Sequence, residues 1–335
     1  MTSGRVAVLL AALSAAAVAA PPAAGSAQTT DRVAVGAFLP NGAANPSMVT
    51  AYAREVGRRP AILDYYRTWD EQPFDAGTLN TVARGGTVPM ITWEPWNHSL
   101  RDIARGRYDD YIRSAARAAV AWGRPVIVRF AHEMNGTWYP WSEAVAGNSA
   151  SEYVAAWRRV IGIFRAERAK NVRWMWAPNV DDQLGNPPAR RLYPGDAYVD
   201  WVGLSGFSWG GKWDWRSPYE VFNFSYQQLL RISARPVAIA ETGASEVGGD
   251  KAAWIRELFG PDLARMSRVR AVIWFNGRKD WANWSVDSSP RALRAFRTAV
   301  ASPRYRGDAA DVVRASAQPT EWGDVPGARA MSFNW

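Results

Sequence analysis

Two glutamates, Glu133 and Glu241, stand at the ends of short apolar runs rich in β-forming residues. If they face one another across a sugar, two carboxyl groups can cleave a glycosidic bond. One is protonated and releases the leaving oxygen, while the other is ionised and attacks the anomeric carbon. Arg129 lies four residues before Glu133, so on a strand both side chains would point to the same side. Its charge would keep Glu241 ionised, while aromatic neighbours would favour the neutral form of Glu133.

The chain has 19 tryptophans, and many of them follow the ends of the apolar runs. Trp122, Trp157 and Trp254 lie in helix-like segments and are interpreted as core residues. Large aromatic side chains gathered on loops usually mark a binding site. Flat rings beside polar groups suit pyranose sugars, whereas nucleobases, which also stack on aromatic rings, would need a basic groove. The candidate sugar contacts from this group are Trp93, Trp96, Trp138, Trp209 and Trp274.

Other polar side chains at the same ends could assist. Asn179 follows the apolar run Val172–Ala177 and is a candidate substrate contact. Asp64, Glu94, Asp181 and Asp182 are interpreted as binders of sugar hydroxyls or as members of structural pairs.

These residues need a scaffold that brings the ends of separate strands together. Eight β-rich runs alternate with helix-like segments, which predicts parallel strands joined by crossover helices. Eight such units fit a single (β/α)8 TIM barrel with the catalytic carboxylates at the ends of strands 4 and 7. The rival, a doubly wound sheet, usually has fewer strands, and no G-x-G-x-x-G follows the first run. The runs are Val33–Leu39, Ala61–Tyr65, Val88–Trp93, Pro125–Ala131, Val172–Ala177, Tyr198–Gly206, Pro236–Glu241 and Ala271–Asn276.

Several other chemistries are excluded by the residues themselves. Cysteine is absent, so there is no disulfide framework, thiolate metal site or cysteine nucleophile. His132-Glu133 begins like the zinc motif H-E-x-x-H, but Gly136 stands where its second histidine would be. No phosphate-binding Walker loop and no G-x-S-x-G motif is present, so we expect no cofactor and no metal.

The formal net charge is +9, and almost all the basic residues are arginine. An arginine-favouring genome explains this bias, and an electropositive surface for an acidic polymer is the alternative. The arginines are scattered and form no basic run, so we expect no nucleic-acid partner.

The first residues resemble an export signal. Arg5 is followed by an apolar and small-residue stretch, Val6–Ala20, and then by small residues around Ala27. This pattern predicts a secretory signal peptide over residues 1–27, and the stretch is short for a membrane span. We therefore expect a secreted monomer without a membrane anchor. Its catalytic domain would cover residues 30–302, and an irregular tail over 303–335 would pack on the barrel.

Two segments are similar to glycoside hydrolase family 26. Residues 129–141, RFAHEMNGTWYPW, resemble its acid/base segment, and residues 236–243, PVAIAETG, resemble its nucleophile segment. The resemblance implies a retaining (β/α)8 enzyme that cuts internal β-linkages in mannan, mixed-linkage β-glucan or β-1,3-xylan. It also implies Glu133 as acid/base and Glu241 as nucleophile, and it places four further residues at the central sugar subsite: Arg129, His132, Trp138 and Trp274.

Two positions depart from the family pattern. The sixth strand of the family usually carries a tyrosine that contacts the nucleophile, and the matching position here is Phe207, which is also a candidate substrate contact. The third strand of mannanases carries Trp-His, whereas this chain has Trp93-Glu94, which favours a glucan-type substrate. Because of Phe207, a barrel that binds polysaccharide without cutting it, or cuts it weakly, is the alternative function.

Overall fold

The structure is a computed structural model that describes residue 1 and residues 32–145, 147–180, 188–211 and 213–316. Contacts divide the chain into residues 1–30 and residues 31–335, and all elements below lie in the second unit. The expected signal peptide and the apolar residues at the very end of the chain fall outside the described ranges.

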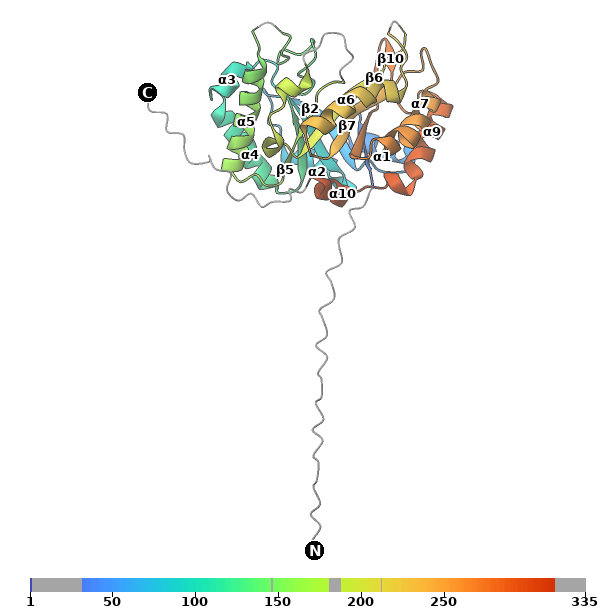
Figure 1. The fold of residues 1–335 in the computed structure, drawn as a ribbon, viewed down its shortest axis with the longest axis horizontal. Coiled ribbons are helices and arrows are strands. Elements are labelled where there is room, and N and C mark those ends of the chain that lie inside the picture. The colour runs from blue at the N-terminus through green and yellow to red at the C-terminus, as the bar shows by residue number, and fades with distance from the viewer. Residues whose placement is uncertain (2–31, 146, 181–187, 212, 317–335) are drawn as a thin grey trace, which may run out of the picture. The chain divides into compact units, whose positions relative to one another are not determined.

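Eight parallel strands close into a barrel in the order β1 to β8 (Figure 1). This confirms the (β/α)8 barrel predicted from the sequence. Each expected run overlaps one strand, with ends shifted by a few residues. The bounds are β1 Ala34–Phe38, β2 Ile62–Thr68, β3 Val88–Glu94, β4 Val126–Phe130, β5 Val172–Trp176, β6 Trp201–Ser208, β7 Val237–Ala244 and β8 Val269–Phe275.

Helices surround the barrel and begin at identifiable caps. The Ser217 hydroxyl accepts a hydrogen bond from the Glu220 N–H, and the Glu220 carboxylate accepts one from the Ser217 N–H. This reciprocal cap begins α6, which has Pro218 in its first turn. Gly57 and Gly123 end α1 and α4 in the left-handed conformation that glycine adopts without strain. The helices are α1 Pro46–Val56, α2 Ala76–Val82, α3 Leu100–Ala104, α4 Asp109–Trp122, α5 Ala150–Ala166, α6 Pro218–Ile232, α7 Lys251–Glu257, α8 Leu263–Arg265, α9 Pro290–Ala301 and α10 Ala309–Ala315. No helix among the described residues is long and apolar enough to cross a membrane.

Alternate residues of each strand enter two different cores. On β8, Ala271 and Ile273 belong to the cluster inside the barrel, whereas Val272 and Trp274 belong to the cluster between strands and helices. This alternation is the period of two expected for a strand. It decides which residues at the strand ends can reach the mouth of the barrel.

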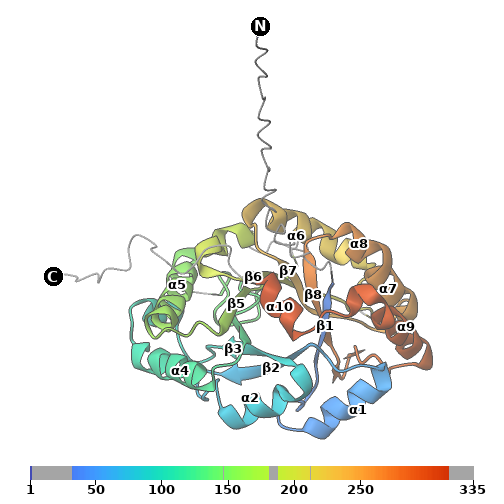
Figure 2. The ribbon, with the colours of Figure 1, turned by 90° about the horizontal axis from the view of Figure 1, so that it is seen from below.

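The amino-terminal end of the barrel is closed by α10, which contacts β1 and β8 and lies across that end when seen from below (Figure 2). Val312 of α10 is buried in the interior cluster with Ala34 and Ile62. The sequence predicted an irregular tail from Pro303, but residues 303–316 contain a short 3-10 turn and this helix. Residues 317–335 lie outside the described ranges.

Candidate active site

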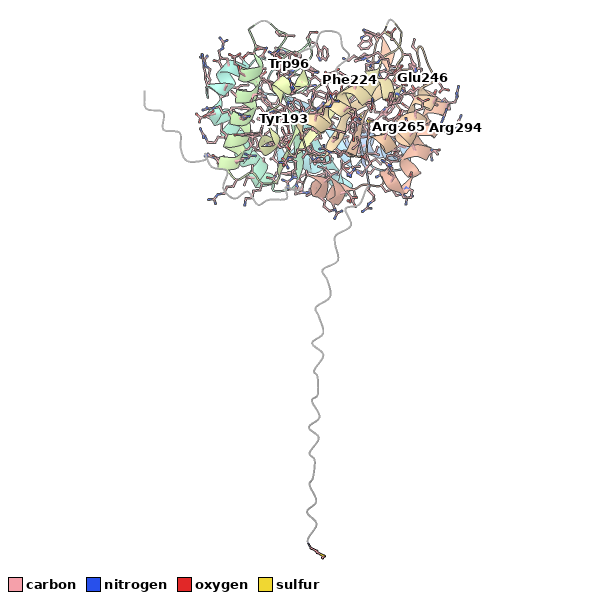
Figure 3. The ribbon with its side chains drawn as sticks, in the orientation of Figure 1. Trp96, Tyr193, Phe224, Glu246, Arg265 and Arg294 are labelled. Atoms are coloured by element: carbon pink, nitrogen blue, oxygen red, sulfur yellow. The ribbon has the colours of Figure 1, made fainter. Side chains whose placement is uncertain are left out.

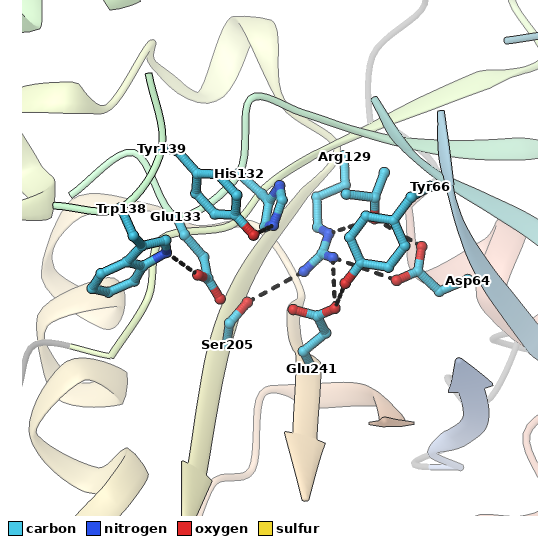
Figure 4. A network of polar contacts seen from close by, with 10 residues as sticks. Asp64, Tyr66, Arg129, His132, Glu133, Trp138, Tyr139, Ser205 and Glu241 are labelled. Atoms are coloured by element: carbon cyan, nitrogen blue, oxygen red, sulfur yellow. Dashed lines mark hydrogen bonds and ion pairs between the residues drawn. The ribbon is translucent and has the colours of Figure 1, made fainter. Parts of the chain in front are cut away.

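Glu133 and Glu241 meet at the carboxyl-terminal mouth of the barrel (Figure 4). A carboxylate oxygen of each and a ring nitrogen of His132 all lie within 4.8 Å of one another. Both glutamates are buried, with 7% and 3% of their surface exposed. The structure therefore brings together the two carboxyl groups that the sequence singled out.

A bulge in β7 turns Glu241 into the barrel. Leu204 of β6 pairs with Ile239, but the next residue, Ser205, pairs with Glu241, so Ala240 is an extra residue in the ladder. Ile239 faces the helices and Ala240 faces the interior, so regular alternation would have pointed Glu241 outward. Bulges next to active sites commonly re-aim a side chain in this way.

Glu133 reaches the mouth through irregular backbone. Strand β4 ends at Phe130, and both Ala131 and Glu133 have positive φ angles, 42° and 50°. The sequence expectation that Arg129 and Glu133 would share a side because of strand alternation is wrong, although both reach the site. Non-glycine residues seldom adopt positive φ, so the surrounding contacts must hold them there. One such contact is the Glu133 N–H, which donates to the Ala177 carbonyl at 2.8 Å.

The Glu133 carboxylate is held by an indole. Trp138 Nε1 donates to Glu133 Oε2 at 2.8 Å, while 48% of Trp138 remains exposed. The indole passes so close to Gly136 that a Cβ there would lie 2.6 Å from its ring. Gly136, which excluded the zinc motif, is thus required for the approach of Trp138 to the candidate acid.

Arg129 is the electrostatic centre of the site. It is fully buried, and its Nη2 lies 3.0 Å from Glu241 Oε1 and 3.4 Å from Asp64 Oδ2. Its Nε donates to Thr92 and its Nη1 to Ser205, at 3.0 and 3.2 Å. Arg129 is thus in contact with Glu241, and its expected role of stabilising the Glu241 charge stays a prediction. Asp64 is a structural partner of Arg129, which is one of the two roles expected for it.

Tyr66 supplies a contact that the sequence analysis missed. Tyr66 belongs to β2, and its hydroxyl donates to Glu241 Oε1 beside the Arg129 guanidinium (Figure 4). The hydroxyl that seemed absent because of Phe207 therefore comes from another strand. Part of the signal was in the sequence: Tyr66 lies two residues after Asp64, so strand alternation puts both side chains on the same face.

The surroundings shift the proton affinities of the two groups that must donate. Burial, followed by the charge of Glu241, raises the pKa of Glu133, against the opposing effects of Arg129 and of hydrogen bonds from Trp138 and Asn179. Burial and Glu241 also raise the pKa of Tyr66 well above its ordinary value, so its hydroxyl keeps its proton and donates. Burial raises the pKa of Asp64 to about 7, and Arg129 opposes that shift.

His132 is buried beside the pair and contacts the Tyr139 hydroxyl through Nε2 at 3.1 Å. Burial and then Arg129 hold its pKa well below the usual value, so the ring is neutral. His132, Glu133 and Glu241 are the one group among the described residues with metal-ligand spacing. The Arg129 guanidinium already neutralises Glu241, which disfavours a second cation there.

Glu94 is a third buried carboxyl group at the mouth, with 7% of its surface exposed. Its Oε2 accepts from Trp96 Nε1 at 2.9 Å, and burial raises its pKa to about 7. Trp96 is 42% exposed at the rim and packs edge-on against Tyr139 and Trp141. Its position fits the expected sugar contact.

Two of the predicted contact residues do not reach the site. Trp93 and Trp274 are fully buried on the outer side of their strands. Trp93 packs on Trp69 with ring centroids 5.0 Å apart, and Trp274 Nε1 donates to the Trp284 carbonyl at 2.7 Å. Both predictions are wrong because strand alternation gives the mouth to the next residue in each case, which is Glu94 or Phe275.

The remaining candidates are at the mouth. The Asn179 side chain forms a hydrogen bond with Glu133. Phe207 and Trp209 are partly exposed, and their ring centroids lie 5.1 Å apart. Asp181 and Asp182 lie outside the described residues.

Comparison with known proteins gives a consistent family signal. The family model described as "Glycosyl hydrolase family 26" matches residues 107–238. "Endoglucanase H" of Acetivibrio thermocellus is 35% identical over 265 residues, covering 76% of this chain and 29% of that protein. "Mannan endo-1,4-beta-mannosidase" of Bacillus subtilis strain 168 is 25% identical and covers 66% of this chain and 68% of its own length.

Solved structures agree on the fold. A Cellulomonas fimi endo-beta-1,4-mannanase double mutant superposes with a TM-score of 0.63 at 17% identity, covering 86% of this chain and 75% of that one. The chain spans less than a third of the length of several curated relatives that it matches.

Proposed function

The chain belongs to glycosyl hydrolase family 26, and we propose that it is an endo-acting β-glucanase that cleaves internal β-1,4 linkages of mixed-linkage β-glucan by double displacement. The observation that carries the mechanism is the spacing of Glu133 and Glu241, whose nearest oxygens lie within 4.8 Å. Carboxyl groups about 5–5.5 Å apart serve retaining enzymes, whereas inverting enzymes need about 6.5–9.5 Å to admit water between them.

In the first step Glu241 attacks the anomeric carbon. Tyr66 and Arg129 both contact Oε1, so we assign Oε2 as the attacking oxygen. Glu133, whose pKa burial raises, gives its proton to the glycosidic oxygen as the bond to the leaving sugar breaks. The glycone, which is the part of the sugar chain that contains the attacked anomeric carbon, is then joined to Glu241 as an ester.

In the second step Glu133 acts as a base. It takes a proton from a water molecule, and the water oxygen attacks the anomeric carbon and releases Glu241 as a carboxylate. Arg129 and Tyr66 stabilise that carboxylate as it regains its charge. Two inversions at the same carbon leave the product with the β-configuration of the substrate.

A glucan is favoured over mannan by two observations. Glu94 stands at the mouth where mannanases carry histidine, and the relative named Endoglucanase H is 35% identical over 76% of the chain. Mannan is the second candidate, because a relative named as a mannosidase aligns over 66% of the chain. The non-catalytic alternative rested on Phe207, and the Tyr66 hydroxyl removes that reason for it.

The test is release of new reducing ends from barley β-glucan, galactomannan and β-1,3-xylan. We expect turnover on β-glucan, and a loss of at least about 10⁴-fold in Glu241→Ala, equivalent to roughly 5.5 kcal/mol of activation free energy. Glu257→Ala, an exposed glutamate on α7, is the matched control and should leave turnover unchanged. Binding to all three polymers without any product would overturn the proposal. Product from galactomannan alone would mean that mannan, and not β-glucan, is the substrate.

We also propose export through the segment 1–27, which rests on its basic start and apolar stretch. Amino-terminal sequencing of protein recovered from culture fluid tests this. A mature chain that still begins at Met1 would contradict it.

A further inference from the structure

A continuous row of aromatic rings leads away from the candidate nucleophile. It begins beside Tyr66, whose ring lies 5.3 Å from Phe38, and Phe38 in turn stacks on Phe275 at 4.4 Å. We call the row the aromatic strip, and its six rings in spatial order are Phe38, Phe275, Phe207, Trp209, Trp281 and Trp213. The next four centroid separations along it are 5.8, 5.1, 5.1 and 4.7 Å.

The strip is open to solvent along its length. Its first four rings are half-buried, and the last two, Trp281 and Trp213, are 42% and 39% exposed. Its rings come from β1, β8, β6 and the loops that follow β6 and β8, so segments far apart in sequence converge to build it. Large apolar surface of this kind, continuous with a catalytic pair, marks a binding surface.

The outer half of the strip is rigidly supported. Trp284 is buried beneath it and meets Trp209 and Trp281 edge-on at 5.1 and 5.4 Å. The short hairpin of β9 (Arg278–Lys279) and β10 (Ala282–Asn283) presents Trp281 between its strands. A rigid surface loses little conformational entropy when a ligand binds, so exposed indoles held in this way favour affinity.

A buried lysine fastens the same loop. Lys251 Nζ donates to the carbonyls of Asn283 and Ser285 at 3.2 and 2.6 Å and to Ser288 Oγ at 2.8 Å. Lys251 has no exposed surface. All three of these hydrogen bonds go to the loop that carries Trp284, so the buried ammonium holds this loop in place.

The two candidate carboxyl groups divide the mouth into two sides. Trp138 bonds Glu133, which protonates the leaving sugar, and Trp96 lies on the same side through its contact with Tyr139. The strip begins at the ring that bonds Glu241, to which the glycone becomes attached. We propose that the aromatic strip, ending at Trp281 and Trp213, is an extended binding site for the glycone part of a β-glucan chain.

This assignment rests on the proposed double displacement and adds to it which arm of the chain is held. The apolar faces of successive glucose units would lie on the rings while Glu241 carries the first unit. The product attached to Glu241 would then stay bound after the leaving part departs. Long glycones should therefore react faster than short ones, and that preference should depend on the outer indoles.

The experiment uses inhibitors that carry a glycone and only fluoride as leaving group: 2-deoxy-2-fluoro-β-cellobiosyl and β-cellotetraosyl fluoride, or their manno counterparts if galactomannan proves to be the substrate. Glu241 displaces fluoride without help from Glu133, and the 2-fluorine makes the ester accumulate, so mass spectrometry follows its formation. We expect the parent enzyme to react at least about tenfold faster with the longer probe, the gain from about 1.4 kcal/mol of added contact.

Trp281→Ala and Trp213→Ala should each reduce that ratio to about threefold or less, consistent with the loss of roughly 0.7 kcal/mol or more of contact. Two controls should keep the parent ratio: Phe224→Ala, an exposed aromatic residue on α6 (Figure 3), and Trp96→Ala, which lies with Trp138 on the side of Glu133. An unchanged ratio in both strip variants, or a loss confined to Trp96→Ala, overturns the glycone assignment alone. Absence of any ester on the parent enzyme overturns double displacement, and the glycone assignment with it.

Discussion

The two ends of the barrel interior are built on the same strands but from opposite kinds of residue. On β2, Ile62 faces the floor, and Asp64 and Tyr66 face the mouth at the next two inward positions. On β4, Ile127 faces the floor and Arg129 the mouth. On β2 and β4 the change from packing to chemistry is made by side chains on regular strands. On β7 and after β4 the backbone contributes as well, through the bulge at Ala240 and the positive φ angles of Ala131 and Glu133.

The consequence is a division between stability and reactivity. The floor is an apolar cluster closed by Val312, and burial of that kind stabilises the fold. The mouth buries Asp64, Glu94, Glu133 and Glu241, and the Arg129 guanidinium pairs with Asp64 and Glu241. Buried charges cost several kcal/mol unless they are paired, as an order of magnitude, so the mouth depends on the stability supplied by the floor.

Arg129→Met should produce the largest effect, because it removes the guanidinium that pairs with both Glu241 and Asp64. We expect a loss of about 3–5 kcal/mol of unfolding free energy from uncompensated buried carboxylates, together with at least about a 10³-fold fall in turnover. Denaturant unfolding and reducing-end assays measure the two. Arg101→Met, which breaks a surface ion pair with Glu152, should change neither appreciably. A fully stable Arg129→Met protein would contradict this view of the mouth.

Trp201→Ala should lower the stability of the protein without changing its turnover. Trp201 is fully buried in the floor cluster, and truncating such a side chain costs about 3–5 kcal/mol. Turnover of the folded protein, measured well below its melting temperature, should remain within about threefold of the parent, because the mouth is untouched. A large fall in turnover without a matching loss of stability would show that floor and mouth are coupled.

Tyr66→Phe tests one hydrogen bond at the mouth. We expect turnover to fall about 10- to 100-fold, as for the loss of a hydrogen bond to a charged group, with little change in stability. Tyr65→Phe is the matched control: Tyr65 is buried on the outer side of the same strand, and its hydroxyl has no partner among the described residues. Equal turnover in the Tyr66→Phe and parent enzymes would mean that Arg129 alone orients Glu241.

Trp138→Phe should have the smallest effect, a shift in pH dependence. The indole N–H favours ionised Glu133 and so lowers its pKa. Its removal should raise that pKa, and the alkaline limb of the kcat/KM profile should move up by about 0.5–1 pH unit. Trp96→Phe, which frees Glu94 instead, should leave the limb nearly in place. A downward shift in Trp138→Phe would mean that the indole does not act through Glu133.

The sequence was sufficient for the barrel because alternating β-rich and helical segments report on eight repeated units. It also identified Glu133 and Glu241 from their place at strand ends. It did not show which face of each strand lies inside the barrel. The sequence predicts Trp93 and Trp274 at the mouth, whereas both side chains face the helices. Alternation fixes two faces but not which is inside, and the β7 bulge at Ala240 alters the alternation within a strand.

Tyr66 was missed for a different reason. The contact between its hydroxyl and Glu241 joins β2 to β7, and these two strands are not neighbours in the closed barrel. Alternation places Tyr66 on the same face of β2 as Asp64, but a contact that crosses the barrel interior leaves no local pattern that identifies its partner. Likewise α10 is short, and nothing in its own residues says that it closes the floor.

The most direct test of the central claim is the configuration of the first product. A proton NMR spectrum taken within the first minutes of hydrolysis, before the anomers equilibrate, shows which hemiacetal is released. If Glu241 forms an ester that Glu133 helps water to open, the β-anomer must appear first and the α-anomer only later by mutarotation. An initial α-anomer would show a single displacement by water, and the close pair of carboxyl groups would then have no role as nucleophile and acid.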